Sequence, residues 1–187
     1  MGTEIEKKYR LMPEQREALS HRLRQVGATL EGREFEVNTL YAGGNLDTRR
    51  QVLRVRRIND EAILTYKERS SDSKSSIRQH REDETRVEDA AALGAILEAL
   101  GYRPTLIYEK SRATWHIQGA EVVLDELPFG LFVEIEGEEK SINEVESLLN
   151  LENAEAEMAT YPELTEKYGE KRGTLIEARF QMQLPEL

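Results

Sequence analysis

The stretch EIEKK, residues 4–8, places three charged side chains on one face of an extended chain. Because successive side chains of a β-strand point to opposite faces, Glu4, Glu6 and Lys8 would share one face and Ile5 the other. In most proteins such a charged face meets water. The other strands decide whether this face is solvated or lines a site.

The same alternation recurs in five further segments of the chain. Charges of like sign stand two residues apart in LRVRR, REDET, YEKSR and FVEIE, and LTYKE carries one lysine in the same kind of pattern. These charges are Arg54 and Arg56, Lys67, Glu82 and Glu84, Lys110 and Arg112, and Glu134 and Glu136. A half-exposed sheet normally shows a mixture of polar residues on its wet face. Sorting by sign over six strands therefore favours a shared interior lined by charge.

Hydrophobic periodicity predicts an α+β protein with about eight antiparallel strands and three or four helices. Strand patterns lie near residues 3–9, 35–42, 52–58, 61–68, 78–88, 106–116, 120–127 and 131–137. Helical patterns run from Pro13 to Gly27 and recur at 87–101, 142–150 and 162–169. Placing the charges inside requires a closed antiparallel β-barrel, with a charged tunnel and with the helices packed outside over apolar residues.

The length of 187 residues fits one domain, which we expect to span residues 1–170, with residues 171–187 as a C-terminal tail or short helix. The chain has no cysteine, no apolar run near the roughly 20 residues of a membrane span, and an acidic start unlike a signal peptide. A net charge of −10 argues against nucleic acid and anionic membranes as partners. We expect a cytoplasmic monomer or homodimer that binds a small molecule.

The interior charges also predict the chemistry of the ligand. Two carboxylates about 4 Å apart repel each other by roughly 4 kcal/mol at an effective dielectric near 20, so the glutamate pairs need a cation. Oxygen ligands without cysteine favour Mg²⁺ or Mn²⁺ over zinc. The arginines and lysines need an anion, and a polyphosphate that bridges to carboxylate-held metal satisfies both groups.

In this order the motifs resemble the CYTH superfamily, the triphosphate tunnel metalloenzymes, which includes class IV adenylyl cyclases, thiamine triphosphatases and inorganic tripolyphosphatases. The E-x-E-x-K signature is similar to Glu4, Glu6 and Lys8, and the charged pairs follow it in the family's order over residues 4–136. Thr65 precedes Lys67 as in the family's T-x-K. Asp125 precedes a hairpin turn that resembles the family's late hairpin, and TYPEL resembles its short C-terminal helix.

The resemblance implies a role for each of these positions. Glu4, Glu6 and Lys8 would form the catalytic group. Metal would be bound by Glu4, Glu6, Glu134 and Glu136, with Glu82, Glu84 and Asp125 as second-site or outer ligands. The triphosphate would be bound by Lys8, Arg54, Arg56, Lys67, Lys110 and Arg112. It also implies in-line attack by water on the terminal phosphorus.

The histidines and one loop depart from the family pattern or lie outside it. The inward position before Glu82 usually carries a basic residue and here is His80, a pH-sensitive candidate for binding phosphate. The segment after Tyr41 has no close acidic residue. His116 shares the parity of the Lys110 pair but lies near a strand end, and His21 has no neighbour at metal-ligand spacing.

Three classes of function remain open. The first is hydrolysis of inorganic tripolyphosphate or of an organic triphosphate such as thiamine or nucleoside triphosphate. The second is a cyclase that makes cyclic AMP and pyrophosphate from ATP. The third is a polyphosphate-binding module without catalysis, which the full set of motif carboxylates disfavours. The hydrolase is preferred because water is the simplest nucleophile.

Overall fold

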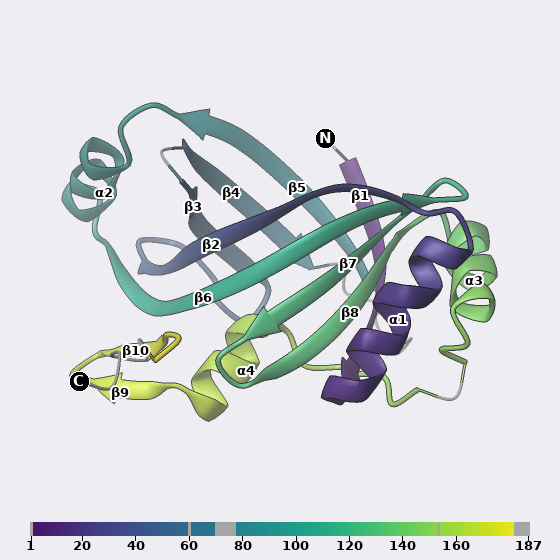
Figure 1. Cartoon of the computed structure of the whole chain (residues 1–187). Coiled ribbons are helices and arrows are strands. Elements are labelled where there is room, and N and C mark those ends of the chain that lie inside the picture. Colours follow the sequence, from purple (N-terminus) through teal and green to yellow (C-terminus); the bar gives the residue numbers. More distant parts are fainter. Residues whose placement is uncertain (1, 60, 70–77, 153, 182–187) are drawn as a thin grey trace.

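The computed structural model describes the backbone of residues 2–59, 61–69, 78–152 and 154–181, and the side chains of residues 2–4, 69 and 78–80 lie outside its description. Within these ranges the chain has ten strands and four helices (Figure 1). The strands are β1 Gly2–Leu11, β2 Thr29–Gly43, β3 Gln51–Ile58, β4 Glu61–Arg69, β5 Arg78–Val87, β6 Tyr102–Ile117, β7 Ala120–Leu127, β8 Gly130–Gly137, β9 Glu170–Arg172 and β10 Leu175–Ala178. The helices are α1 Pro13–Gln25, α2 Ala90–Ala99, α3 Glu139–Leu148 and α4 Tyr161–Tyr168.

The strands form one sheet in the order β2-β3-β4-β5-β1-β8-β7-β6-β10-β9, and β2 also pairs with β6. The pairings are antiparallel except that of β10 with β6. The predicted α+β class and its antiparallel sheet are therefore confirmed. The β1–β8 register sets Glu6 opposite Glu136 and Lys8 opposite Glu134, so the first and last charged motifs are neighbours in space.

Local signals place the helices where the sequence predicts them. α1 has Pro13 in its first turn, where a missing amide proton costs nothing. The Asp89 carboxylate caps α2 by accepting from the backbone amides of Ala91 and Ala92. Thr160 and Glu163 form a capping box at the start of α4. No helix within the described ranges is long and apolar enough to cross a membrane.

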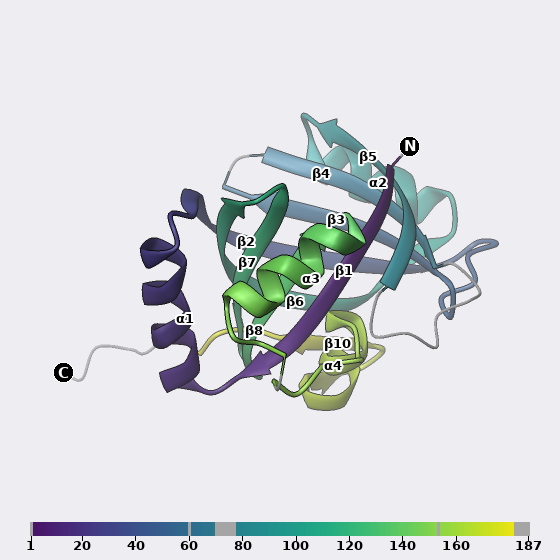
Figure 2. The ribbon, with the colours of Figure 1, turned by 90° about the vertical axis from the view of Figure 1, so that its right-hand side faces the viewer.

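The largest apolar core lies on one face of β1, β6, β7 and β8, under α1 and α3. On these strands alternate residues enter this core, so the charged residues between them point to the other face. Figure 2 shows α3 lying over the sheet next to β1, with α1 farther to the left. The core contains Tyr9, Leu11, Leu19, Leu23, Ala113, Trp115, Val122, Leu124, Val133, Ile135, Ile142 and Val145.

A second core joins α4 to the opposite face of the sheet. Tyr161 and Leu164 of α4 pack with Leu106, Tyr108 and Phe132, which have the parity of the charged residues on their strands. A third, smaller core lies under α2 and is built from Val55, Ala62 and Leu97. α4 therefore packs on the same face of the sheet that carries the charges.

The C-terminal region differs from the expected tail or short helix. Residues 170–172 and 175–178 form the β9–β10 hairpin, and β10 continues the sheet by pairing with β6, Ile176 opposite Leu106. The hairpin turns at Gly173, whose φ of 67° suits glycine. Ala178 is buried in the second core, and this apolar contact anchors a segment whose sequence is too short to reveal a strand. The domain boundary at residue 170 remains a prediction.

We predict that Leu23→Ala in α1 lowers the free energy of unfolding by about 2–5 kcal/mol, because it leaves a cavity in the main core. Leu23 is 0% exposed, whereas Leu100, just after α2, is 65% exposed and serves as the matched control. Leu100→Ala should change stability by no more than about 0.5 kcal/mol. Urea titration measures both, and equal losses would contradict the packing of α1 onto the sheet.

Candidate functional site

A cavity of about 590 Å³ lies on the charged face of the sheet. Side chains from β1, β2, β3, β4, β6, β8 and α4 line it, together with residues 48–50. It takes its charges from the alternate positions whose neighbours fill the main core, such as Lys8 beside Tyr9 and Glu134 beside Val133. The charged lining is thus a consequence of strand alternation.

Three carboxylates gather on one side of this cavity. Oxygen atoms of Glu6, Glu134 and Glu136 all lie within 4.8 Å of one another. Glu6 is 8% exposed and Glu134 is 4% exposed, so water screens their repulsion poorly. This set contains only oxygen ligands, which suits a hard divalent cation. Lys8 also approaches it, with Nζ 3.4 Å from Glu134 Oε1.

Glu36 on β2 is a fully buried carboxylate surrounded by cations. The Lys110 Nζ lies 3.3 Å from its Oε2, and Arg112 Nε and Arg56 Nη1 lie 3.9 and 4.0 Å from its Oε1. The Asn38 side-chain amide donates to Oε2 at 3.1 Å. A carboxylate that is 0% exposed is tolerated only with such compensation.

Asp125 on β7 also contacts Lys110 and Arg112. Arg112 donates to its two oxygens through Nε at 2.8 Å and Nη2 at 2.7 Å, and Lys110 Nζ lies 3.5 Å away. The Tyr161 hydroxyl donates to Asp125 Oδ2 at 2.8 Å. Arg112 Nη2 also donates to Glu134 at 2.9 Å, which joins the basic residues to the acidic set.

A further group of cations comes from β3 and β4. Arg54 Nη2 lies 3.3 Å from Thr65 Oγ1, 3.6 Å from Glu84 and 3.8 Å from Glu82. The Thr65 hydroxyl donates to Glu84 at 2.7 Å, and Lys67 pairs with Glu82. These contacts orient Arg54 and Lys67 along the cavity wall.

The first turn of α4 positions Lys8. The Lys8 ammonium lies 3.9 Å from the centroid of the Tyr161 ring and donates to the carbonyl of Ala159 at 3.1 Å. A cation held over an aromatic face is attracted by the negative potential of the ring. Lys110 lies 5.5 Å from the centroid of the same ring. Tyr161 therefore organises two cations and one carboxylate at once.

The pKa shifts of Glu36 and Arg112 favour their charged forms, whereas that of Lys110 favours its neutral form. Burial raises the pKa of Glu36, but Lys110, Arg112 and Arg56 outweigh it and hold that pKa well below the ordinary value. Burial lowers the pKa of Arg112, yet Asp125 and Glu134 raise it well above the usual range. Burial, with the nearby Arg112, lowers the pKa of Lys110.

The structure brings most of the predicted residues together. Glu6, Lys8, Arg54, Arg56, Lys67, Lys110, Arg112, Glu134 and Glu136 all line the cavity. The side chains of Glu4 and His80 lie outside the described ones, although the backbone register sets these two residues opposite each other. Asp125, Glu82 and Glu84 contact cations of the site. Their roles as metal ligands remain predictions.

Sequence reasoning missed Glu36 and Tyr161. Glu36 and Asn38 alternate on β2 in the same way as the charged pairs, and this pattern was a usable signal. However, Glu34 alternates equally well and is exposed, so parity alone does not single out Glu36. Tyr161 is reached only through the packing of α4, which brings it to Asp125, 36 residues earlier in the chain.

We predict that Glu36→Gln lowers the free energy of unfolding by about 3–5 kcal/mol, because it leaves buried cations with less compensation. Glu34→Gln, on the same strand but exposed, should cost no more than about 0.5 kcal/mol. Since the pKa of Glu36 is lower in the folded chain, its stabilisation is present above the unfolded pKa of about 4 and is lost on acidification. Urea titrations from pH 7 downward should show a weaker acid dependence for Glu36→Gln than for Glu34→Gln. An equal acid dependence of stability in the two variants would contradict this role of Glu36.

Similar folds occur in solved structures. The PH1012 protein from Pyrococcus horikoshii is 24% identical, with a TM-score of 0.74 over 86% of this chain and 98% of that chain. A "putative adenylate cyclase" from Vibrio parahaemolyticus is 20% identical, with a TM-score of 0.71 over 86% of this chain and 96% of that one. A "putative adenylyl cyclase" from Hippeastrum, described as having a dominant triphosphatase activity, is 20% identical, with a TM-score of 0.70 over 88% and 95%. No curated protein matches the sequence.

The model of the CYTH domain matches residues 2–167, nearly the whole chain. The family resemblance predicted from Glu6, Lys8 and the pairs that follow them is confirmed, and the chain belongs to the CYTH domain family.

Proposed function

We propose that the protein is a divalent-metal-dependent phosphohydrolase that acts on triphosphates, either inorganic tripolyphosphate or an organic triphosphate. One observation carries the proposal: a single cavity brings six basic side chains of the strands, together with Arg49 and Arg50 of the loop before β3, against three clustered carboxylates. The six basic residues of the strands are Lys8, Arg54, Arg56, Lys67, Lys110 and Arg112. A polyphosphate chain with metal is a ligand whose charges match both sides.

A closed tunnel is part of this proposal. It is supported by the two pairings of β2, which lies against β3 through residues 36–41 and against β6 through residues 29–43. A ring of strands has no free edge and holds inward side chains in fixed relative positions. Fixed positions matter here because phosphoryl transfer is catalysed mainly by positioning and charge stabilisation.

The donor set fits Mg²⁺ or Mn²⁺. Glu6, Glu134 and Glu136 would hold the ion through carboxylate oxygens that already lie within 4.8 Å of one another. When bound, the ion would withdraw charge from phosphate oxygens and make a coordinated water more acidic. Lys8 lies beside Glu134 and would keep that carboxylate oriented.

The basic residues would bind and orient the phosphate oxygens. The Nε atoms of Arg54 and Arg56 are buried, and neither has a hydrogen-bond partner among the groups that the structure describes. Unmatched buried donors of this kind suit an anionic ligand. Arg112, fixed by Asp125 and Glu134, would add charge where negative charge develops in the transition state.

Water is the nucleophile in this proposal. It attacks the terminal phosphorus, the bridging P–O bond breaks, and the products are phosphate and the shortened diphosphate. The reaction needs no covalent intermediate with the protein, because cations stabilise the leaving oxygen and the transferred group.

A class IV adenylyl cyclase is the second candidate. Apolar side chains, among them Leu40, Leu53 and Leu106, also line the cavity and would contact an organic group of the substrate. The relative from Vibrio parahaemolyticus carries a cyclase name, whereas the one from Hippeastrum is described by a dominant triphosphatase activity. Both names accompany the same fold, so the choice depends on the products formed.

We predict that tripolyphosphate or an organic triphosphate yields phosphate with Mg²⁺ or Mn²⁺, and that EDTA abolishes turnover. Tripolyphosphate, ATP and thiamine triphosphate are tested in parallel, with phosphate, pyrophosphate and cyclic AMP measured separately. Glu134→Gln should lose most activity, because it removes one charged ligand and keeps the shape of the side chain. Pyrophosphate with cyclic AMP would select the cyclase, and near-normal turnover by Glu134→Gln at limiting metal would contradict the metal assignment.

We also predict that Arg54→Ala weakens binding of a non-hydrolysed triphosphate by at least about tenfold, equivalent to roughly 1.4 kcal/mol. Arg57 on the same strand is the control, since it has the opposite parity and is exposed. Arg57→Ala should bind as the wild type does. Calorimetry at fixed salt measures both affinities, and similar losses would mean that general electrostatic attraction, rather than the inward face of β3, binds the anion.

A further inference from the structure

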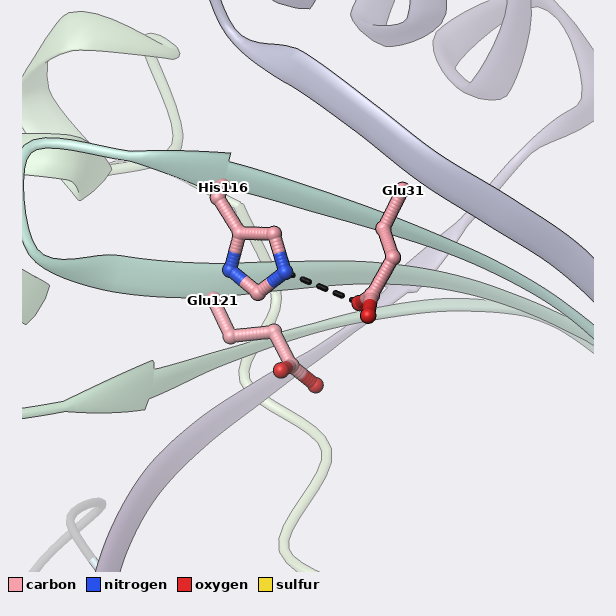
Figure 3. A group of neighbouring side chains, drawn as sticks. All are labelled: Glu31, His116 and Glu121. Atoms are coloured by element: carbon pink, nitrogen blue, oxygen red, sulfur yellow. Dashed lines mark hydrogen bonds and ion pairs between the residues drawn. The ribbon is translucent and has the colours of Figure 1, made fainter.

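A second group of potential metal ligands lies outside the cavity lining. Ligand atoms of Glu31, His116 and Glu121 lie within 4.8 Å of one another. The Nε2 of His116 is 2.9 Å from a carboxylate oxygen of Glu31, and Figure 3 shows the Glu121 carboxylate beside the same imidazole. Unlike the carboxylate set of the cavity, this group contains a nitrogen ligand.

Three neighbouring strands position these side chains. His116 on β6 is directly opposite Glu121 on β7, and paired residues of adjacent strands share a face of the sheet. Glu31 lies at the irregularity in the β2–β6 register between Leu30 and Gly32. A bulge of this kind redirects a side chain, and here it brings Glu31 to His116.

The same register places the group beside the acidic side of the cavity. Glu121 is opposite Glu136 on β8, which in turn is opposite Glu6 on β1. Glu6, Glu136 and Glu121 therefore form one row, which leads from the cavity to the group of Glu31, His116 and Glu121. Two ligand sets of different composition lie next to each other on one face of the sheet.

The carboxylates of Glu31 and Glu121 differ from those of the cavity in the basic residues that neutralise them. Within the described part of the chain, neither Glu31 nor Glu121 forms an ion pair with a lysine or arginine, whereas Glu134 contacts both Lys8 and Arg112. His116 and Glu31 have side chains that are 50% and 63% exposed, so an ion in solution can reach them. Two close carboxylates and an accessible imidazole attract a divalent cation.

We propose that Glu31, His116 and Glu121 form a binding site for Zn²⁺, distinct from the magnesium- or manganese-type site of the cavity. One imidazole nitrogen with carboxylate oxygens suits zinc, whereas an oxygen-only set suits harder ions. His116 Nε2 binds the ion in its unprotonated form, and the ion replaces the contact between this nitrogen and Glu31. Water completes the coordination. The site does not depend on the proposed hydrolase activity, because no substrate takes part in it.

Thermal melts with Zn²⁺ or Mg²⁺ test the site in the wild type and in His116→Gln. His21→Gln is the matched control, since His21 is an exposed histidine of α1 and lies outside the group. At about 100 times its dissociation constant, Zn²⁺ should raise the wild-type Tm by about 5–11 °C. His116→Gln should lose this rise, His21→Gln should keep it, and the response to Mg²⁺ should be the same in all three proteins.

NMR gives a direct measurement, in which the imidazole signals of the wild type are followed during a Zn²⁺ titration. The signal that is missing in His116→Gln should move on addition of Zn²⁺, and Glu121→Gln should require more Zn²⁺ for the same movement. An equal Zn²⁺ rise in Tm for His116→Gln and wild type overturns the proposal, because the cavity carboxylates would then bind the ion. A stationary His116 signal overturns it as well.

Discussion

The burial of carboxylates among cations is the constraint on which the rest of the structure depends. Glu36 and Asp125 are both fully buried, and each contacts Lys110 and Arg112. An isolated buried charge would cost several kcal/mol, so each member of this group requires the others. The strands that carry them must therefore keep one register, and the register in turn aligns Glu6, Glu134 and Glu136 at the acidic side of the cavity.

The opposite face of the same strands supplies the stability that this arrangement needs. Apolar residues such as Trp115, Val122, Val133 and Ile135 alternate with the charged ones and pack beneath α1 and α3. Burial of this core is the main favourable contribution to folding, and it permits a polar cavity that contributes little net stability. The two faces are thus coupled, because a slip of one residue would exchange them.

α4 links the charged face to the end of the chain. Tyr161 accepts two cations at its ring and donates its hydroxyl proton to Asp125, while Leu164 packs into the second core. Lys8 and Lys110 are therefore held by an aromatic residue as well as by carboxylates. In the proposed function, the charged side chains bind the phosphate oxygens, and apolar side chains of the cavity such as Leu40 and Leu106 contact the group beyond the phosphates.

The period of two in the strands made much of the site predictable. Once Glu6 and Lys8 share a face, the same rule assigns Arg54, Lys110 and Glu134 to the interior, and capping residues such as Asp89 and Thr160 mark the helices. These features are local, so a single sequence contains them. They sufficed to indicate the antiparallel α+β class and most of the charged residues that line the cavity.

Other features depend on contacts between distant segments. Glu34 and Glu36 have the same residue type and the same parity, yet only Glu36 is enclosed by cations of β3 and β6, so burial followed from its neighbours in space. Tyr161 meets Asp125 only because α4 packs on the sheet, and β10 joins the main sheet by pairing with β6. The sequence by itself determined which side chains share a face of each strand. The tertiary structure decided which of them meet, because pairing register and packing join residues that no local pattern connects.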